Sequence, residues 1–237
     1  MSQRDNRADI TWPRAIIWDL DGTLIDSAPD LATALNTVLN EQDLNSLTIP
    51  QVRLMVGGGV AKLIERAFRG SRVELDAEGA EALAPGFMEI YSNCATNKTT
   101  LLPAAGRMLN YFYNAGVQQG LCTNKPEAVT IKILHELDIH SFFSSVIGGD
   151  STARKKPHPL PLQTVMGQLG VTPHECIMVG DSGADVGAAH AAGIPIVLVP
   201  DGYIGVPAES LGADFVLKSL SSLPDEINRF SPVQKSA

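Results

Sequence analysis

Cysteine is scarce and irregularly spaced in this sequence, and long apolar runs are missing. The 237 residues contain three cysteines, Cys94, Cys122 and Cys176, an odd number without the Cys-X-X-Cys spacing of many metal and redox sites. Because Cys122 and Cys176 lie in or beside apolar segments, we expect buried, reduced thiols and a cytoplasmic location. No stretch approaches the roughly 18 apolar residues that span a bilayer, and residues 1–14 lack the apolar core of a signal peptide.

Positive charge is also in short supply. The chain carries 18 Lys and Arg against 26 Asp and Glu, a net charge of −8. Nucleic acids and anionic membranes recruit basic surfaces, so we expect neither as a partner. With 44% hydrophobic and 19% charged residues, the chain can bury a sizeable core, and only its ends, such as a tail after about Arg229, are expected to fray. Composition leaves both a monomer and a homodimer open.

Most of the chain shows strands and helices in alternation, at the spacing of βαβ units. Strands are expected at 14–18, 117–122, 146–148, 176–180, 194–199 and 215–217, and helices at 103–115, 126–137, 160–169 and 182–192. This order predicts an α/β core with a doubly wound, Rossmann-like parallel sheet.

One segment interrupts the alternation. Residues 27–97 contain helical patterns only, expected at 30–40, 50–56, 60–69 and 77–92. Apolar residues recur there at helical spacing, as at Leu31, Leu35 and Val38. We therefore divide the chain into a core of residues 1–26 and 98–237 and a small all-helical domain of residues 27–97.

Two carboxylates follow the first expected strand. Asp19 and Asp21 lie in the segment Asp-Leu-Asp-Gly-Thr, directly after an apolar run, and so at the edge of a parallel sheet where ligands bind. Two acids so close repel each other unless one holds a proton or a cation lies between them, and a hard divalent ion such as Mg²⁺ prefers oxygen ligands. The alternative is an ordinary turn, because Asp and Gly are common turn residues.

Four motifs in this order resemble those of the haloacid dehalogenase superfamily of phosphohydrolases. That family carries an Asp-X-Asp-Gly-Thr motif, then a Ser or Thr, then a Lys, then a second acidic pair. The matching residues are Asp19 and Asp21, then Thr123, then Lys156, which precedes a proline, and finally Asp181 and Asp185. The resemblance covers nearly the whole chain. It implies a Mg²⁺-dependent phosphomonoester hydrolase that acts on a small phosphorylated metabolite through an aspartyl-phosphate.

The resemblance also implies a role for the first acidic pair. Asp19 would be the nucleophile and a metal ligand. Asp21 would lend its backbone carbonyl to the metal, while its side chain acts as general acid and base. A receiver-like module, in which Asp19 only accepts a phosphate, would leave Asp21 without a function.

Roles for the later motifs follow from the same resemblance. Thr123 and Asn124 would hold phosphoryl oxygens, and Lys156 would neutralise charge shared by the phosphoryl group and Asp19, with Lys125 as the alternative lysine. Asp181 would be a direct metal ligand. Asp185 would orient a metal-bound water or Lys156.

The helical segment resembles the C1-type cap of the family and would select the substrate. Gly57, Gly58 and Gly59 precede a helix that carries Lys62 and Arg66, an arrangement suited to an anion, although a plain flexible turn is equally consistent. The motifs look most like the phosphoglycolate phosphatase branch, which makes the carboxylate of 2-phosphoglycolate the expected second anion.

Other activities share these motifs. A phosphomutase of the β-phosphoglucomutase type differs in its cap, and related phosphatases act on sugar phosphates, nucleotides or pyrophosphate. Dehalogenases lack the second acid, so Asp21 argues against carbon–halogen chemistry. A phosphonatase would need a Schiff-base lysine in the cap, for which Lys62 is a candidate.

Overall fold

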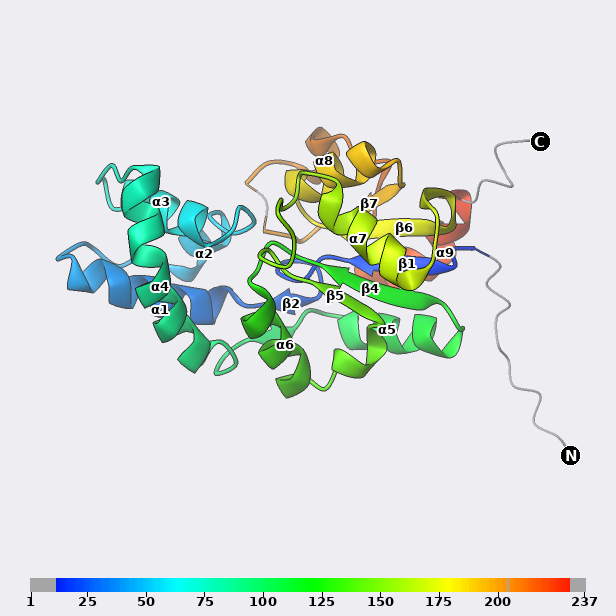
Figure 1. The fold of residues 1–237 in the computed structure, drawn as a ribbon, viewed down its shortest axis with the longest axis horizontal. Coiled ribbons are helices and arrows are strands. Elements are labelled where there is room, and N and C mark those ends of the chain that lie inside the picture. The colour runs from blue at the N-terminus through cyan, green and yellow to red at the C-terminus, as the bar shows by residue number, and fades with distance from the viewer. Residues whose placement is uncertain (1–11, 204, 231–237) are drawn as a thin grey trace, which may run out of the picture.

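A six-stranded parallel sheet forms the centre of the molecule (Figure 1). The computed structural model describes residues 12–203 and 205–230, so residues 1–11 and most of the tail predicted after Arg229 lie outside the described residues. The strand order is β5–β4–β1–β6–β7–β8, and every neighbouring pair is parallel. The strands are β1 (Ala15–Trp18), β4 (Gln118–Cys122), β5 (Ser145–Ile147), β6 (Cys176–Gly180), β7 (Ile196–Leu198) and β8 (Phe215–Val216).

Helices cover both faces of the sheet, as Figure 1 shows. On one face lie α5 (Ala105–Asn114), α6 (Glu127–Glu136) and α9 (Leu223–Glu226), and on the other lie α7 (Leu160–Leu169) and α8 (Gly183–Ala192). Side chains alternate between the two faces along β1. Ile16 and Trp18 join the first apolar cluster, whereas Ala15 and Ile17 join the second. This arrangement confirms the predicted doubly wound α/β core.

The direction of winding reverses at β1. The chain runs from β1 to β4 and β5, then returns to β6 on the other side of β1. Trp18, the last residue of β1, is therefore paired with Leu121 of β4 and with Val179 of β6. Ligands bind at such switch points in open α/β sheets, outside the carboxyl ends of the strands. Asp19 follows the central strand at this point.

Four helices between β1 and β4 form a group at the other end of the molecule (Figure 1). They are α1 (Ala28–Glu41), α2 (Ile49–Arg53), α3 (Val60–Gly70) and α4 (Ala77–Cys94). All four were expected, but α2 ends three residues before the predicted Val56. The chain turns there toward Gly57 and Gly59, both of which have a positive φ that ends regular helix. The boundaries of this group at residues 27 and 97 stay a prediction.

The two connections between the helical group and the sheet pair with each other. β2 (Ile25–Asp26) and β3 (Thr100–Leu101) form an antiparallel two-stranded ribbon. Neither strand was predicted from the sequence, because a segment of two residues is too short to show a periodic pattern. Asp30, buried at the start of α1, supports this junction by accepting hydrogen bonds from the backbone N–H groups of Lys98 and Thr99, at 2.9 and 2.8 Å.

The state of the cysteines and the character of the helices were also predicted from the sequence. Cys122 and Cys176 are buried and free, as expected, and Cys94 is free and partly exposed. Within residues 12–203 and 205–230, no helix combines the length and the apolar character needed to cross a membrane.

Candidate active site

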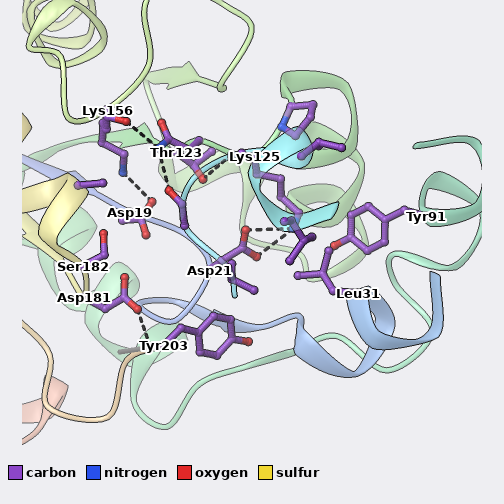
Figure 2. A pocket seen from close by; sticks show the side chains of 18 of the residues that line it. Asp19, Asp21, Leu31, Tyr91, Thr123, Lys125, Lys156, Asp181, Ser182 and Tyr203 are labelled. Carbon is purple, nitrogen blue, oxygen red and sulfur yellow. Dashed lines mark hydrogen bonds and ion pairs between the residues drawn. The ribbon is translucent and has the colours of Figure 1, made fainter. Parts of the chain in front are cut away.

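A pocket that is partly open to solvent lies between the sheet edge and the helical group (Figure 2). Its lining includes carboxylates and lysines from the loops that follow β1, β4, β5 and β6. Helices α1, α3 and α4 contribute apolar side chains. The structure thus brings the four sequence motifs to one place.

Asp19 lies at the centre of the site. Its backbone N–H donates to the carbonyl of Val179 at 2.9 Å, which fixes it to the end of β6 as well as to β1. The residue is 7% exposed, and its Oδ1 accepts a hydrogen bond from Lys156 Nζ at 2.7 Å. Asp19 is therefore held rigidly, with little contact with water.

Lys156 joins three acceptors. Besides Asp19, its ammonium donates to Asp185 Oδ1 at 2.6 Å and to the carbonyl of Cys122 at 2.5 Å. Burial alone would lower the pKa of Lys156, but the negative charges of Asp185 and Asp19 outweigh it and raise the pKa above the usual value. The lysine is therefore a fixed positive charge beside Asp19.

Asp181 and Asp185 make different contacts. Asp181 Oδ2 accepts the backbone N–H of Tyr203 at 2.6 Å. Asp185 is fully buried, and its Oδ2 accepts the backbone N–H of Ser182 at 3.0 Å and the Ser182 hydroxyl at 2.7 Å. Ser182 and Asp185 form the capping box of α8. Both oxygens of Asp185 are thus engaged, one of them by Lys156, and the orienting role of Asp185 stays a prediction.

The buried carboxylates fit a divalent cation. Asp19, Asp181 and Asp185 each offer an oxygen within 4.8 Å of the others. Burial, together with the charge of Asp185, raises the pKa of Asp19 from 3.8 to about 7, and burial with the charge of Asp19 raises that of Asp181 well above 3.8. An oxygen-ligated divalent ion would offset this repulsion. Because Asp185 is saturated by its own partners, Asp19 and Asp181 are the better ligands.

Two glycines allow the loops around Asp181 to approach closely. Gly22 has a φ of +87°, and a Cβ atom there would overlap Asp181 Oδ2. A Cβ atom at Gly202 would overlap the Cβ of the same aspartate. Side chains at either position would push the loops after β1 and β7 away from Asp181.

Asp21 points away from Asp19 and toward the helical group (Figure 2). Its two carboxylate oxygens accept hydrogen bonds from Lys125 Nζ at 2.9 and 3.0 Å, and Oδ1 also accepts from the Ser27 hydroxyl at 2.5 Å. Lys125, the alternative to Lys156 in the sequence analysis, therefore has a separate partner. The two lysines hold the two acids of the first motif.

Thr123 and Asn124 both line the pocket. Thr123 Oγ1 accepts the backbone N–H of Lys125 at 3.2 Å, which leaves its hydroxyl proton to be donated to a ligand. Asn124 Nδ2 donates to the carbonyls of Gly57 and Lys156, both at 2.9 Å. The Asn124 amide therefore links the helical group to the sheet.

The expected substrate contacts of α3 are only partly in place. Gly57 and Gly59 line the pocket, but Gly58, Lys62 and Arg66 are not among the described residues that do. Lys62 forms an exposed ion pair with Glu65 at 2.6 Å. Arg66 donates to the carbonyl of Met55 at 2.7 Å, so it holds the backbone before the glycines instead of facing the pocket. Lys62 and Arg66 were predicted as substrate contacts because they follow the glycines in the sequence. The sequence does not show that each has a hydrogen-bond partner within the helical group.

Two tyrosines that line the pocket, Tyr203 and Tyr91, were not predicted from the sequence. The Tyr203 hydroxyl donates to Asp26 Oδ1 at 2.5 Å and accepts the backbone N–H of Ala28 at 3.0 Å. Tyr203 follows strand β7 and comes directly after Gly202, and this position in the sequence could have placed it at the same edge of the sheet. Tyr91 lies on α4 and is 1% exposed. Its sequence pattern is that of any core aromatic residue, so the sequence carries no such signal for it.

Known proteins are similar to this chain over most of its length. The chain is 39% identical over 217 residues to a phosphoglycolate phosphatase from Rhodospirillum rubrum, covering 90% of each protein. It is 38% identical over 209 residues to a phosphoglycolate phosphatase from Caulobacter vibrioides, covering 88% of each. Among solved structures, a predicted phosphoglycolate phosphatase from Haemophilus somnus superposes with a TM-score of 0.84 at 30% identity, over 92% of this chain and 99% of that one.

A family model gives the same result. The model of the haloacid dehalogenase-like hydrolases matches residues 16–199, which include all four motifs. With its doubly wound core and its acidic site at the switch point, the chain belongs to the haloacid dehalogenase-like hydrolase family, and it is an enzyme.

Proposed function

We propose that this enzyme is a Mg²⁺-dependent phosphatase that hydrolyses 2-phosphoglycolate through an aspartyl-phosphate on Asp19. The observation that carries the proposal is the position of Asp19 at the switch point of the sheet, 2.7 Å from Lys156 and beside Asp181. The names of the Rhodospirillum rubrum and Caulobacter vibrioides relatives support the choice of substrate.

The first half of the reaction transfers the phosphoryl group to the enzyme. An Asp19 carboxylate oxygen attacks phosphorus, and the bond from phosphorus to the ester oxygen breaks. Lys156 offsets negative charge shared by the phosphoryl group and Asp19, and the Thr123 hydroxyl donates to a phosphoryl oxygen. Mg²⁺ bound by Asp19, Asp181 and the backbone carbonyl of Asp21 would supply the remaining positive charge.

Asp21 moves the protons in both halves. It gives a proton to the ester oxygen, which leaves as the hydroxyl group of glycolate. It then takes a proton from water, whose oxygen attacks phosphorus, releases inorganic phosphate and restores Asp19. Ser27 and Lys125, which both donate to Asp21 Oδ1, hold the carboxylate in place between the two steps.

Residues 27–97 act as a cap in this proposal. The hydrogen bond from Asn124 to Gly57 joins the helical group to the core directly beside the site. Apolar side chains of α1, α3 and α4 line the same pocket. A cap in this position excludes water during phosphoryl transfer and contacts the end of the substrate that does not react.

The direct test is phosphate release by the Asp19→Asn variant, which keeps the shape of the side chain but removes its charge. We expect kcat/KM for 2-phosphoglycolate to fall roughly 10³-fold or more, because nucleophile and metal ligand are lost together. Asp43→Asn, an exposed residue after α1, is the matched control and should behave as wild type. Excess chelator should abolish wild-type activity, and added Mg²⁺ should restore it.

Two outcomes would contradict the proposal. Hydrolysis at wild-type rate by Asp19→Asn would exclude the aspartyl-phosphate. A substrate panel that includes hexose 1-phosphates, nucleotides and pyrophosphate tests the substrate. Conversion of a hexose 1-phosphate to its 6-phosphate without phosphate release would identify a phosphomutase instead.

A further inference from the structure

Two hydrogen-bond donors at the cap side of the pocket have spare capacity. The Lys125 ammonium has three protons, of which two are directed to the oxygens of Asp21. The Tyr91 hydroxyl is buried beside the Lys125 ammonium, and none of the described residues accepts its proton. A buried hydroxyl whose proton has no acceptor is costly, so this hydroxyl is poised for a ligand that can accept the proton.

The two donors lie next to each other although they come from different parts of the chain. Lys125 follows β4 in the core, and Tyr91 lies on α4 of the helical group. Lys125 Nζ is 4.8 Å from the centre of the Tyr91 ring, and both residues line the pocket. In Figure 2 the Tyr91 hydroxyl is directed into the pocket, on the side where Lys125 and Asp21 meet.

The charges of the pocket distinguish its two ends. Among the described residues that line it, Lys156 and Lys125 are the cations. Lys156 is held by Asp19, Asp185 and the carbonyl of Cys122 at the phosphoryl end. Lys125 is therefore the lining cation near the cap. Burial alone would lower its pKa, but the charge of Asp21 raises it, so Lys125 stays positive.

The surroundings favour a small anion over a sugar. Leu31, Val60, Leu63, Phe87 and Met88 also line the pocket, and none of these side chains can bind a hydroxyl group. A sugar would leave several hydroxyl groups without partners against this wall, which is unfavourable. A carboxylate, in contrast, accepts hydrogen bonds from both an ammonium and a phenol, and such charge-assisted bonds are strong where water is excluded.

We propose that Lys125 and Tyr91 together bind the carboxylate of a short phosphocarboxylate and so determine the specificity of the enzyme. This inference rests on the proposed phosphatase activity and deepens it, because it names the residues that recognise the non-reacting end of 2-phosphoglycolate. Lys125 contributes charge from the core, and Tyr91 contributes a hydroxyl from the cap. The carboxylate therefore contacts both parts of the molecule.

The test compares two substrates that differ only at this end. 2-Phosphoglycolate carries a carboxylate where 2-hydroxyethyl phosphate carries a hydroxymethyl group. We expect the ratio of their kcat/KM values to fall at least tenfold in Lys125→Met and about fivefold in Tyr91→Phe, mainly through a higher KM for 2-phosphoglycolate. Tyr91→Phe keeps the ring that stacks on Phe87 at 5.7 Å, so it tests the hydroxyl without disturbing the packing of α4.

Matched controls remove the same groups elsewhere. Lys218→Met and Tyr113→Phe alter an exposed lysine and an exposed tyrosine outside the pocket, and both should keep the wild-type ratio. The double variant Lys125→Met/Tyr91→Phe should lose less selectivity than the product of the two single effects, because both groups act on one carboxylate.

Several results would overturn the inference. An unchanged ratio in both variants would exclude it while leaving the phosphatase proposal intact. An equal loss for both substrates in Lys125→Met would show that Lys125 acts through Asp21 alone. A loss of selectivity in Lys62→Ala, with none in Lys125→Met, would show that Lys62 on helix α3 binds the carboxylate instead. Absence of phosphate release by the wild type from either substrate would refute the phosphatase proposal, and the inference with it.

Discussion

At the scale of single residues, the site is dominated by buried carboxylates that need positive charge. Asp19 and Asp181 are 7% and 2% exposed, and the Lys156 ammonium lies between Asp19 and Asp185. One lysine cannot neutralise three carboxylates, which is why burial and the charge of Asp185 raise the pKa of Asp19 to about 7. The excess negative charge of these buried carboxylates thus favours the binding of a cation.

The raised pKa of Asp19 predicts how the stability of the protein depends on pH, with and without a bound metal. The pKa of Asp19 is about 7 in the folded protein and near 3.8 when unfolded, so without metal the folded state binds more protons between pH 4 and 7. The contribution of Asp19 to the free energy of unfolding should therefore fall as pH rises through this window, by about 1.4 kcal/mol for each pKa unit. In the proposed function Mg²⁺ binds the ionised carboxylate of Asp19, so the stabilising effect of Mg²⁺ should grow in the same window.

The measurement is Tm in chelator and in Mg²⁺ at pH 5 and pH 8. We expect the increase of Tm caused by Mg²⁺ to be larger at pH 8. Asp19→Asn should show a small increase at both pH values, because its amide does not titrate. An increase that shrinks from pH 5 to pH 8 would contradict the assignment of Asp19 as a ligand.

At the scale of elements, short loops after neighbouring strands place the acids. β1 ends at Trp18 and β6 at Gly180, so Asp19 and Asp181 each directly follow a strand of the central pair. The loop after β1 then turns at Gly22, whose φ of +87° is a backbone conformation that residues with a side chain rarely adopt. The same turn brings the loop against Asp181.

Gly22→Ala should therefore weaken metal binding and stability together. The added Cβ requires an unfavourable backbone conformation and would overlap Asp181 Oδ2. We expect a loss of about 1–3 kcal/mol in the free energy of unfolding, with weaker Mg²⁺ binding in a thermal titration. Gly86→Ala is the control, because a Cβ there meets nothing within 4 Å in helix α4. It should stabilise the protein by about 0.5–1 kcal/mol and leave Mg²⁺ affinity unchanged. Equal Mg²⁺ affinity in both variants would contradict the role given to Gly22.

At the scale of the whole molecule, polar contacts join the helical group to the core. The covalent connections pair as β2 and β3, and Asp26 of β2 accepts hydrogen bonds from Arg53 of α2 and from Tyr203 of the core, both at 2.5 Å. Beside the pocket, the Asn124 amide joins Gly57 to the core. These contacts hold the helical group over the active site.

Removing the Asn124 amide should loosen the attachment of the helical group to the core beside the pocket. Asn124→Ala leaves the carbonyls of Gly57 and Lys156 without their donor, a loss of about 0.5–1.5 kcal/mol for each hydrogen bond. We expect KM for 2-phosphoglycolate to rise about tenfold, with faster hydrogen exchange at the backbone amides of Gly57 and Gly59.

Asn36→Ala is the matched control. Its amide donates to the carbonyl of Leu47 within the helical group at 2.9 Å, and its Oδ1 accepts the Leu47 backbone N–H at 2.7 Å. This variant should lower Tm without raising KM. If both variants raised KM equally, general weakening of the helical group would explain the effect, and Asn124 would have no special part in closure.

The sequence alone determined the doubly wound core and the identity of the acids that gather at one edge of its sheet, whereas the switch point at β1 follows from the strand order of the structure. Asp19, Thr123 and Asp181 each come directly or almost directly after an apolar strand, and the ends of parallel strands meet at one edge of a sheet. Strand period and position in the chain are local properties, so they could be read before the structure was known. The four helices of residues 27–97 were predictable for the same reason.

Only the tertiary structure decided which side chains meet. Lys125 contacts Asp21 across 104 positions of the chain, and Lys156 contacts Asp19 across 137. The approach of Tyr91 to Lys125 and the pairing of β2 with β3 also depend on how distant segments pack. Periodicity describes which face of an element is apolar, but it carries no information on the partner of a polar side chain. That partner is set by the register of the strands and by the position of the helical group over the sheet.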